Sequence, residues 1–268
     1  MLTAGYIATI LMGVVLGIMG GGGSILTVPI LVYLFHIPPV TATGYSLFVV
    51  GITSLIGAII YFKRGETDFK TGAALAVPSA IGVSISRLYL VPALPLEIYR
   101  FNNFVLSKDI LIMISFAFIM LAAAVSMIRI KPVVKDIKPV ARFSTIATQG
   151  LILGLIAGFV GAGGGFLIIP ALVMLIGLPM RKAVGTSLMI ITFQSLVGFA
   201  GDAFNAPAID WNMLYVTAAA ASSGIALGSI VAKRFNEQIL KKAFGIFVLI
   251  MGATILIEQL ASLTRSSL

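Results

Sequence analysis

Eight long apolar segments, separated by polar or proline-containing breaks, constrain the fold of this chain more than any other feature. They cover residues 5–35, 41–62, 71–92, 108–128, 143–178, 183–201, 211–232 and 239–260. A bilayer core about 30 Å thick takes about 20 apolar residues per helix, and six of the segments have roughly that length. Only 10% of the residues are charged, against about 25% in a soluble domain. The sequence therefore predicts an all-α integral membrane protein without a large soluble catalytic domain.

The first and fifth segments are too long for one crossing, and each contains a glycine run near its middle. The runs are Gly20-Gly21-Gly22-Gly23 and Gly161-Ala162-Gly163-Gly164-Gly165. Because a glycine costs a helix interior about 1 kcal/mol, four together should end the helix. We expect each segment to form a hairpin of two short helices around a glycine hinge. The second helix should begin at Ser24 in one hairpin and at Phe166 in the other.

The two glycine-containing segments are copies of one another. Over residues 13–57, 18 of 45 positions recur at a constant offset of 141 without a gap. The identities are carried by glycine, proline and serine, for example Pro29 with Pro170 and Ser46 with Ser187, rather than by interchangeable aliphatic residues. We therefore predict an internal duplication, with residues 1–128 and 143–268 as its two halves.

The basic residues indicate how the two halves are oriented. If each glycine-hinged segment returns to the side on which it began, loops 63–70, 129–142, 181–182 and 233–242 share one side and hold 14 of the 18 lysines and arginines. That side should be cytoplasmic. Each half then has a hairpin plus three crossings, so the repeats are inverted, the basic linker 129–142 is cytoplasmic and both termini lie outside the plasma membrane. Re-entrant and fully crossing hairpins fit this count equally well.

The hinges are candidates for binding an anion. A helix that begins again at membrane depth has unpaired N–H groups and a partial positive charge at its start. Glycines let an anion approach that backbone closely. The candidate substrate-binding residues are Gly20, Gly21, Gly22, Gly23, Ser24, Gly161, Gly163, Gly164 and Gly165. The alternative is close helix packing, which we expect for Gly13-x3-Gly17 and Gly154-x3-Gly158.

A few other polar residues lie within the apolar segments. Ser54, Gln194 and Ser195 are candidates for substrate contact, with ordinary interhelical hydrogen bonding as the alternative. Thr43, Ser46, Thr186 and Ser187 are expected to cap helices, and Asp210 is expected to do so at the segment that follows it. Arg87 lies near a segment end, where its side chain is expected to reach the membrane interface.

Other function classes find little support. The chain has no cysteine and one histidine, His36, so thiolate chemistry and a histidine-rich metal centre are excluded, and an intramembrane enzyme or a resident cofactor is not expected. The net charge of +9 is explained by cytoplasmic loops rather than by nucleic acid. The expected partners are the lipid bilayer and a small anionic substrate, and the oligomeric state is left open.

The first half contains the pattern Gly13-x3-Gly17-x2-Gly20-Gly21-Gly22-Gly23-x5-Pro29. The second half repeats it as Gly154-x3-Gly158-x2-Gly161-Ala-Gly-Gly-Gly165-Phe-x3-Pro170, followed by Ala183-Val-Gly185-Thr-Ser-Leu188. With these motifs the sequence resembles the sulfite exporter TauE/SafE family over essentially the whole chain. The resemblance implies a permease for sulfite or a related sulfur oxyanion or organosulfonate, commonly moving it outward. It also places the family's glycine-rich hairpins on residues 20–24 and 161–165. Tyr45 stands where the second half has Thr186, and a phenol near the transport pathway would change its shape. A transporter or channel for another small solute or ion is the alternative.

Overall fold

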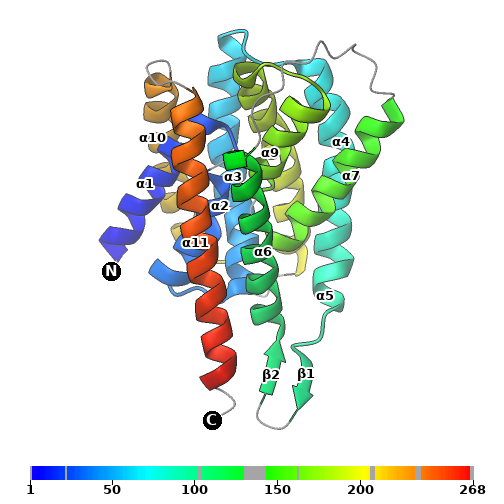
Figure 1. The fold of residues 1–268 in the computed structure, drawn as a ribbon, viewed down its shortest axis with the longest axis vertical. Coiled ribbons are helices and arrows are strands. Elements are labelled where there is room, and N and C mark those ends of the chain that lie inside the picture. The colour runs from blue at the N-terminus through cyan, green and yellow to red at the C-terminus, as the bar shows by residue number, and fades with distance from the viewer. Residues whose placement is uncertain are drawn as a thin grey trace.

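The computed structural model describes residues 2–21, 23–101, 104–129, 143–161, 163–205, 209–232 and 237–265. Its long helices run side by side in one bundle, and both chain ends lie in the lower half of the view (Figure 1). These helices are α1 (Leu2–Met19), α3 (Pro39–Lys63), α4 (Phe69–Ile85), α6 (Lys108–Arg129), α7 (Phe143–Val160), α9 (Met180–Asn205), α10 (Trp211–Val231) and α11 (Glu237–Arg265). Each coincides with one of the apolar segments identified in the sequence or with part of one, to within a few residues at its ends, which confirms the helical prediction.

Four helical spans in the described part of the chain are long and apolar enough to cross a membrane. They are Pro39–Lys63, Phe69–Ala93, Met180–Ala203 and Trp211–Val231. Shorter apolar helices accompany them, at Thr3–Met19, Ser24–Leu34, Thr145–Val160 and Val248–Ala261. Large apolar side chains are exposed around the outside of the bundle, such as those of Ile59, Ile81 and Leu227. An apolar exterior of this kind is suited to lipid rather than to water.

Both long apolar segments are broken helices, as predicted. In the first, α1 ends at Met19 and α2 (Ser24–Pro29) continues as the π-helical turn η1 (Ile30–Leu34). In the second, α7 ends at Val160 and α8 (Gly165–Pro170) continues as η3 (Ala171–Leu175). The helix Ser24–Leu34, at about 1.5 Å per residue, reaches roughly half of a 30 Å bilayer core. The second leg of this hairpin is therefore too short to cross the bilayer alone.

Helices of residues 1–128 pack against helices of residues 143–268. In the first pair α1 packs along α10, and in the second α7 packs along α4. The glycine faces predicted for packing lie in these contacts: a β-carbon on Gly13 would lie 3.1 Å from the Cα of Ala221, and one on Gly154 would lie 2.8 Å from the Cα of Ser79. The packing prediction for Gly13 and Gly154 is confirmed. Gly13 and Gly154 match under the offset of 141, and their partners Ala221 and Ser79 match under an offset of 142.

The central helices α3 and α9 run antiparallel. A β-carbon on Gly44, near the start of α3, would lie 2.7 Å from Oδ2 of Asp202, near the end of α9. Further along α3, a β-carbon on Gly57 would lie 3.0 Å from Cδ1 of Leu188, near the start of α9. Buried aliphatic side chains around this crossing form the core. Both helices contain residues that recur in the sequence at the offset of 141, such as Ser46 in α3 and Ser187 in α9.

Helices α4 and α10 begin in the same way. Asp68 accepts a hydrogen bond from the Thr71 N–H at 3.1 Å, and Asp210 accepts one from the Met213 N–H at 3.0 Å. The N–H of Asp68 also donates to Thr186 Oγ1 at 2.9 Å, and the N–H of Asp210 donates to the Tyr45 hydroxyl at 2.8 Å. The predicted capping by Asp210 is confirmed. Tyr45 and Thr186 hold the starts of these helices, so the Tyr45 hydroxyl lies at α10 rather than at a glycine hinge.

The stretch between α4 and α6 differs from the second half of the chain. Helix α4 continues through the π-helical turn η2 (Ser86–Leu90) into α5 (Val91–Ala93). Strands β1 (Glu97–Phe101) and β2 (Phe104–Ser107) then form an antiparallel hairpin beyond the bundle (Figure 1). These strands were not expected from the sequence. They lie where the first half is longer than the second.

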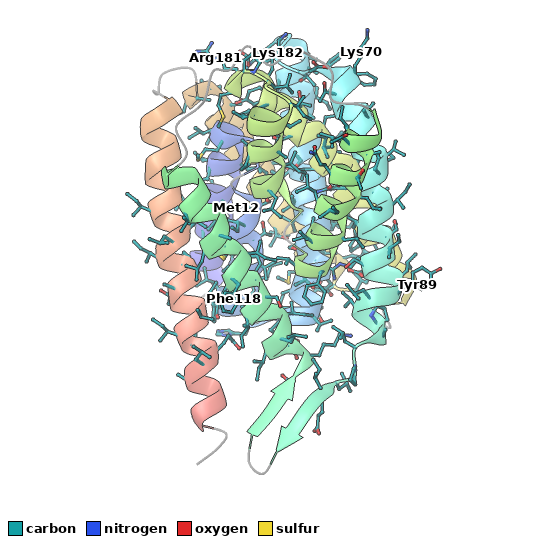
Figure 2. All side chains as sticks on the ribbon, turned by 45° about the vertical axis from the view of Figure 1, so that its right-hand side comes forward. Met12, Lys70, Tyr89, Phe118, Arg181 and Lys182 are labelled. Carbon is teal, nitrogen blue, oxygen red and sulfur yellow. The ribbon has the colours of Figure 1, made fainter. Side chains whose placement is uncertain are left out.

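Basic side chains gather at the opposite end of the bundle. Lys70, Arg181 and Lys182 lie together at the upper end, whereas the β hairpin projects from the lower end (Figure 2). Loops 63–70 and 181–182 therefore share one side, as their charge predicted. Of the other two predicted basic loops, 129–142 and 233–242, residues 130–142 and 233–236 lie outside the described residues, and residues 237–242 belong to α11.

Candidate functional site

The two glycine hinges meet in the interior. A β-carbon on Gly21 would lie 2.7 Å from the Cα of Gly165, and one on Gly165 would lie 2.6 Å from the Cα of Gly21. Both glycines are buried. The two predicted halves of the site are thus in backbone-to-backbone contact, although they are far apart in the sequence.

The backbone of the second hinge requires glycine. Gly161, Gly163 and Gly164 have φ angles of +73°, +65° and +63°, a left-handed conformation that L side chains rarely adopt. Helix α8 begins at Gly165, one residue before the predicted restart at Phe166, whereas α2 begins at Ser24 as predicted. In the first hinge Gly20 has φ +76°, and Gly22 lies outside the described residues.

Several donors at the hinges are engaged within the hinges themselves. Ser24 donates to the Gly21 carbonyl through its N–H at 3.3 Å and through its hydroxyl at 2.7 Å. The N–H of Leu26 donates to the Gly23 carbonyl at 3.0 Å, and the N–H groups of Leu167 and Ile168 share the Gly164 carbonyl. These donors would have to leave their carbonyls to bind an anion.

Gln194 ties the second hinge to two helices. Its Nε2 donates to the Gly163 carbonyl, and its Oε1 accepts from the Ser79 hydroxyl of α4. Gln194 is fully buried in α9. Interhelical hydrogen bonding was the alternative role considered for Gln194, and the structure shows it. The bond to the Gly163 carbonyl fixes the position of that peptide.

Ser54 and Ser195 are buried hydroxyls without a hydrogen-bond partner in the described part of the chain. Both are 0% exposed, one in α3 and the other at the equivalent position of α9. A β-carbon on Gly163 would lie 3.0 Å from the Ser195 Oγ, so this hydroxyl lies against the second hinge. Buried hydroxyls usually have hydrogen-bond partners. In the described part of the chain, these two are therefore available to donate to a ligand.

Arg87 is part of the same region, contrary to its predicted position at the membrane interface. Its side chain is 1% exposed, Nη1 lies 3.1 Å from Asp202 Oδ2, and Nη1 donates to Thr43 Oγ1 at 3.1 Å. A β-carbon on Gly161 would collide with its Nη2. The prediction was wrong because Arg87 sits in the turn η2, which is packed against α9 and the second hinge. Asp202 lay one residue beyond its apolar segment, so nothing in the sequence paired it with Arg87.

Thr43 and Ser46 do not cap α3, so the capping prediction was wrong for both. The helix begins at Pro39, which places them inside it. Thr43 donates to the Val40 carbonyl at 2.7 Å, and Ser46 donates to the carbonyls of Thr43 and Gly161. The hydroxyl of Ser46 therefore joins α3 to the second hinge.

The same correction applies to the start of α9, which begins at Met180 and so contains Thr186 and Ser187. Ser187 donates to the Val184 carbonyl at 2.8 Å, and Thr186 accepts the N–H of Asp68. A β-carbon on Gly20 would lie 2.9 Å from Ser187 Oγ. Ser187 therefore lies beside the first hinge, as Ser46 lies beside the second.

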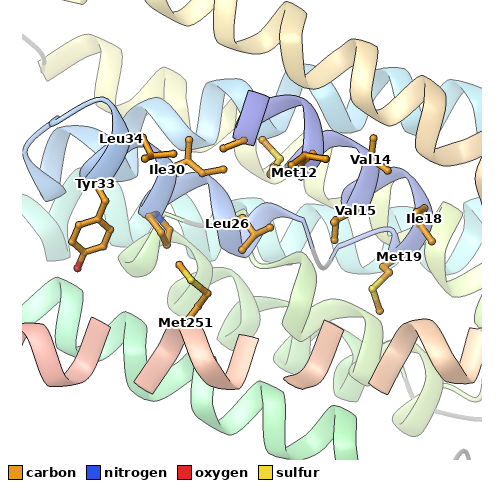
Figure 3. A pocket seen from close by; sticks show the side chains of 13 residues that line it. Met12, Val14, Val15, Ile18, Met19, Leu26, Ile30, Tyr33, Leu34 and Met251 are labelled. Atoms are coloured by element: carbon orange, nitrogen blue, oxygen red, sulfur yellow. The ribbon is translucent and has the colours of Figure 1, made fainter. Parts of the chain in front are cut away.

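A cavity of about 630 Å³ lies apart from these polar groups, between α1, the segment α2–η1 and α11 (Figure 3). Its walls are apolar and include Met12, Val15, Leu26 and Met251. None of the predicted site residues lines it. Among the described residues, no group of three or more histidine, aspartate or glutamate side chains could hold a metal ion.

Comparison with known proteins agrees with the architecture of the molecule. The family model for the sulfite exporter TauE/SafE matches residues 6–255. The chain belongs to this family. A probable membrane transporter protein of Xylella fastidiosa (strain 9a5c) is 26% identical over 260 residues, which cover 94% of both chains. The probable membrane transporter protein YunE of Bacillus subtilis is 25% identical over 284 residues, covering 96% of this chain and 99% of YunE.

A third relative, the probable membrane transporter protein MJ0441 of Methanocaldococcus jannaschii, is 28% identical over 70% of this chain and 69% of its own. No solved structure matches the chain significantly. The TauE/SafE membership and the apolar helices together make the protein a multi-pass membrane protein of a transporter family.

Proposed function

We propose that this member of the TauE/SafE family is a permease for small oxyanions, with sulfite and related sulfur oxyanions or organosulfonates as its substrates, and that it exports them across the plasma membrane. The contact between Gly21 and Gly165 carries this proposal. It brings two interrupted helices, α2 and α8, together inside the bundle, where their polar ends have little access to water. Broken helices that meet in this way are typical of substrate sites in secondary transporters.

The polar groups beside the hinges favour an anion. Ser195, against the second hinge, has a hydroxyl that can donate, as has Ser54 at the equivalent position of α3, and the starts of α2 and α8 add partial positive charge. Glycine at Gly163 and Gly165 places no side chain of its own over the backbone of the second hinge. An anion bound here would receive donors without needing a lysine at the centre of the membrane.

We further propose that residues 1–128 and 143–268 are inverted repeats that move relative to one another, and that both termini are outside. The antiparallel course of α3 and α9 supports this arrangement. So does the packing of α1 against α10 and of α7 against α4, since each pair joins one helix from each half. The basic end with Lys70, Arg181 and Lys182 would then be cytoplasmic (Figure 2). An interior-negative potential drives an anion outward by about 2.3 kcal/mol per charge per 100 mV, which suits export.

Flux from proteoliposomes tests the substrate and the driving force. Vesicles would be loaded separately with sulfite, thiosulfate, sulfate, sulfoacetate or taurine, and a potassium gradient with valinomycin would set the potential. We expect protein-dependent release of at least one sulfur oxyanion or organosulfonate, faster when the protein's cytoplasmic side is negative. Release of none of these compounds would contradict the proposal, and release that requires a proton gradient but ignores voltage would contradict the proposed driving force.

Orientation has a direct test because the chain contains no cysteine. Thr3→Cys and Lys182→Cys would be introduced one at a time, and intact cells would be treated with a membrane-impermeant maleimide. We expect Thr3→Cys to react and Lys182→Cys to react only after lysis. The reverse result would invert the proposed topology.

A further inference from the structure

The guanidinium of Arg87 has one engaged edge and one free edge. Nη1 faces Asp202 and Thr43, each at 3.1 Å. Nε and Nη2 have no hydrogen-bond partner in the described part of the chain, although the residue is 2% exposed. We infer that this free edge binds two oxygens of the transported oxyanion. Asp202 is the counter-ion of Arg87 in the absence of substrate, and the oxyanion competes with it for the guanidinium. The inference rests on the proposed function and names the residues that recognise its substrate.

The shape of the free edge selects the ligand. The Nε–H bond and one Nη2–H bond of a guanidinium lie in one plane and point the same way, so they donate to two oxygens of one group. A sulfur oxyanion offers two such oxygens, whereas a halide or a cation does not. A lysine ammonium keeps the charge but lacks the planar fork.

The position of Arg87 makes its unused donors informative. Buried N–H groups in proteins nearly always have acceptors, and a charged side chain at membrane depth usually serves a function. Arg87 belongs to the π-helical turn η2, and such turns are frequent at functional sites. Its Nη2 lies against Gly161, where a β-carbon would collide with it. The free edge of the guanidinium is therefore next to the second glycine hinge.

The equivalent place in the other half has an arginine, Arg64, which donates to the Ser229 carbonyl at 2.9 Å, but no ion pair among the described residues. Under the offset of 141, Thr43 and Asp202 correspond to Val184 and Tyr61. Arg87 corresponds to Ser229 under the offset of 142 that relates Asp68 to Asp210 and Gly82 to Gly224. A β-carbon on Gly20 would lie 2.8 Å from the Cα of Val184, in the way that one on Gly161 would lie 2.6 Å from the Cα of Thr43. In the described part of the chain the contact at Gly20 therefore forms without an ion pair, and packing alone does not explain why Arg87 is paired with Asp202.

Asp202 is placed to yield to an incoming anion. Its side chain is 23% exposed, whereas that of Arg87 is 1% exposed, so the carboxylate is less enclosed by the protein and can move while the guanidinium stays in place. Nη1 keeps its hydrogen bond to Thr43 in either case. An oxyanion on the free edge would repel the nearby carboxylate. Removing the carboxylate charge should therefore strengthen anion binding.

The test compares Arg87→Lys, Asp202→Asn and Arg64→Lys with the wild-type protein in phosphatidylcholine vesicles, which carry no anionic headgroup. Arg64→Lys is the matched control, because Arg64 donates to the Ser229 carbonyl at 2.9 Å, away from Asp202. Dissociation constants for sulfite and thiosulfate would be measured by titration, together with the melting temperature and the flux.

We expect Arg87→Lys to weaken oxyanion binding at least tenfold, Asp202→Asn to strengthen it at least threefold, and Arg64→Lys to leave it unchanged. Binding by Arg87→Lys within twofold of the wild type would overturn the inference. If Arg87→Lys does not fold, weaker or unchanged binding by Asp202→Asn would overturn it as well. Both results leave the proposed function standing if the wild type still transports, whereas a wild type that neither binds nor releases these anions refutes the proposed function itself.

Discussion

Gly21 and Gly165 lie so close together that a β-carbon on Gly21 would be 2.7 Å from the Cα of Gly165 and closer still to its carbonyl. Real β-carbons essentially never come this near to another heavy atom. The neighbouring atoms belong to the backbone, so no side chain can rotate out of the way. The contact between the two hinges therefore depends on the absence of a side chain at both positions.

Replacing Gly21 with alanine should push the hinges apart. Inserting an extra carbon into a tightly packed interior typically costs about 1–3 kcal/mol of the free energy of unfolding, and we expect transport to be lost at the same time. Melting temperature and proteoliposome flux would be measured for Gly21→Ala and Gly165→Ala. The control is Gly65→Ala, because nothing lies within 4 Å of the new β-carbon there. Wild-type flux in Gly21→Ala would show that transport does not need the close contact.

The control itself has an expected cost. Gly65 has φ +71°, so an alanine there should lose about 1–2 kcal/mol of stability from backbone strain. Its transport should nevertheless match that of the wild type. The comparison separates a loss of stability in the fold from a loss of contact between the hinges.

The free hydroxyls of Ser54 and Ser195 should matter for transport and not for stability. Because neither has a partner among the described residues, Ser54→Ala and Ser195→Ala remove a buried polar atom without breaking a hydrogen bond. We expect an unchanged or slightly higher melting temperature and a severalfold fall in flux. Thr53→Val is the control, since the Thr53 hydroxyl donates to the Val49 carbonyl at 2.6 Å. A wild-type flux in both alanine variants would remove the serines from the site.

Much of the fold could be predicted because its determinants are local. The apolar lengths fix the helices, and the runs of glycine at 20–23 and 161–165 end a helix because each glycine in a helix interior costs about 1 kcal/mol. The charge of loops 63–70 and 181–182 placed both at one end of the bundle, since lipid excludes that charge wherever it occurs in the sequence. The strands β1 and β2 escaped prediction because they lie in the part of the first half without a counterpart in the second.

The polar contacts of the site could not be predicted, because they join residues far apart in the chain. Arg87 was predicted to be interfacial because it lies near the end of its apolar segment. The sequence does not reveal that Asp202, which is far away in the chain, packs beside it. Thr43 and Ser46 looked like caps because the start of α3 at Pro39 was placed too late. In each case the missing information was which helix packs against which, and hydropathy does not contain it.

Gln194 should be a structural residue of the second hinge. Gln194→Ala would leave the Gly163 carbonyl and the Ser79 hydroxyl without their bonds, at about 1–3 kcal/mol for each buried group left unsatisfied. We expect a clear fall in the melting temperature. Thr192→Val in the same helix is the control, because the Thr192 hydroxyl donates only to the Leu188 carbonyl of its own helix. Equal melting temperatures for the two variants would show that Gln194 does not hold the hinge.

Tyr45 and Thr186 should have equivalent, purely structural effects. Tyr45→Phe removes the acceptor for the Asp210 N–H, and Thr186→Val removes the acceptor for the Asp68 N–H. Each loss should cost about 0.5–1.5 kcal/mol, the net contribution of a typical hydrogen bond. The order of preference among sulfite, thiosulfate and sulfate should stay the same in both variants, because these hydroxyls hold the starts of α10 and α4 rather than the glycine hinges. If the order of preference changed in Tyr45→Phe but not in Thr186→Val, Tyr45 would contribute to the transport pathway after all.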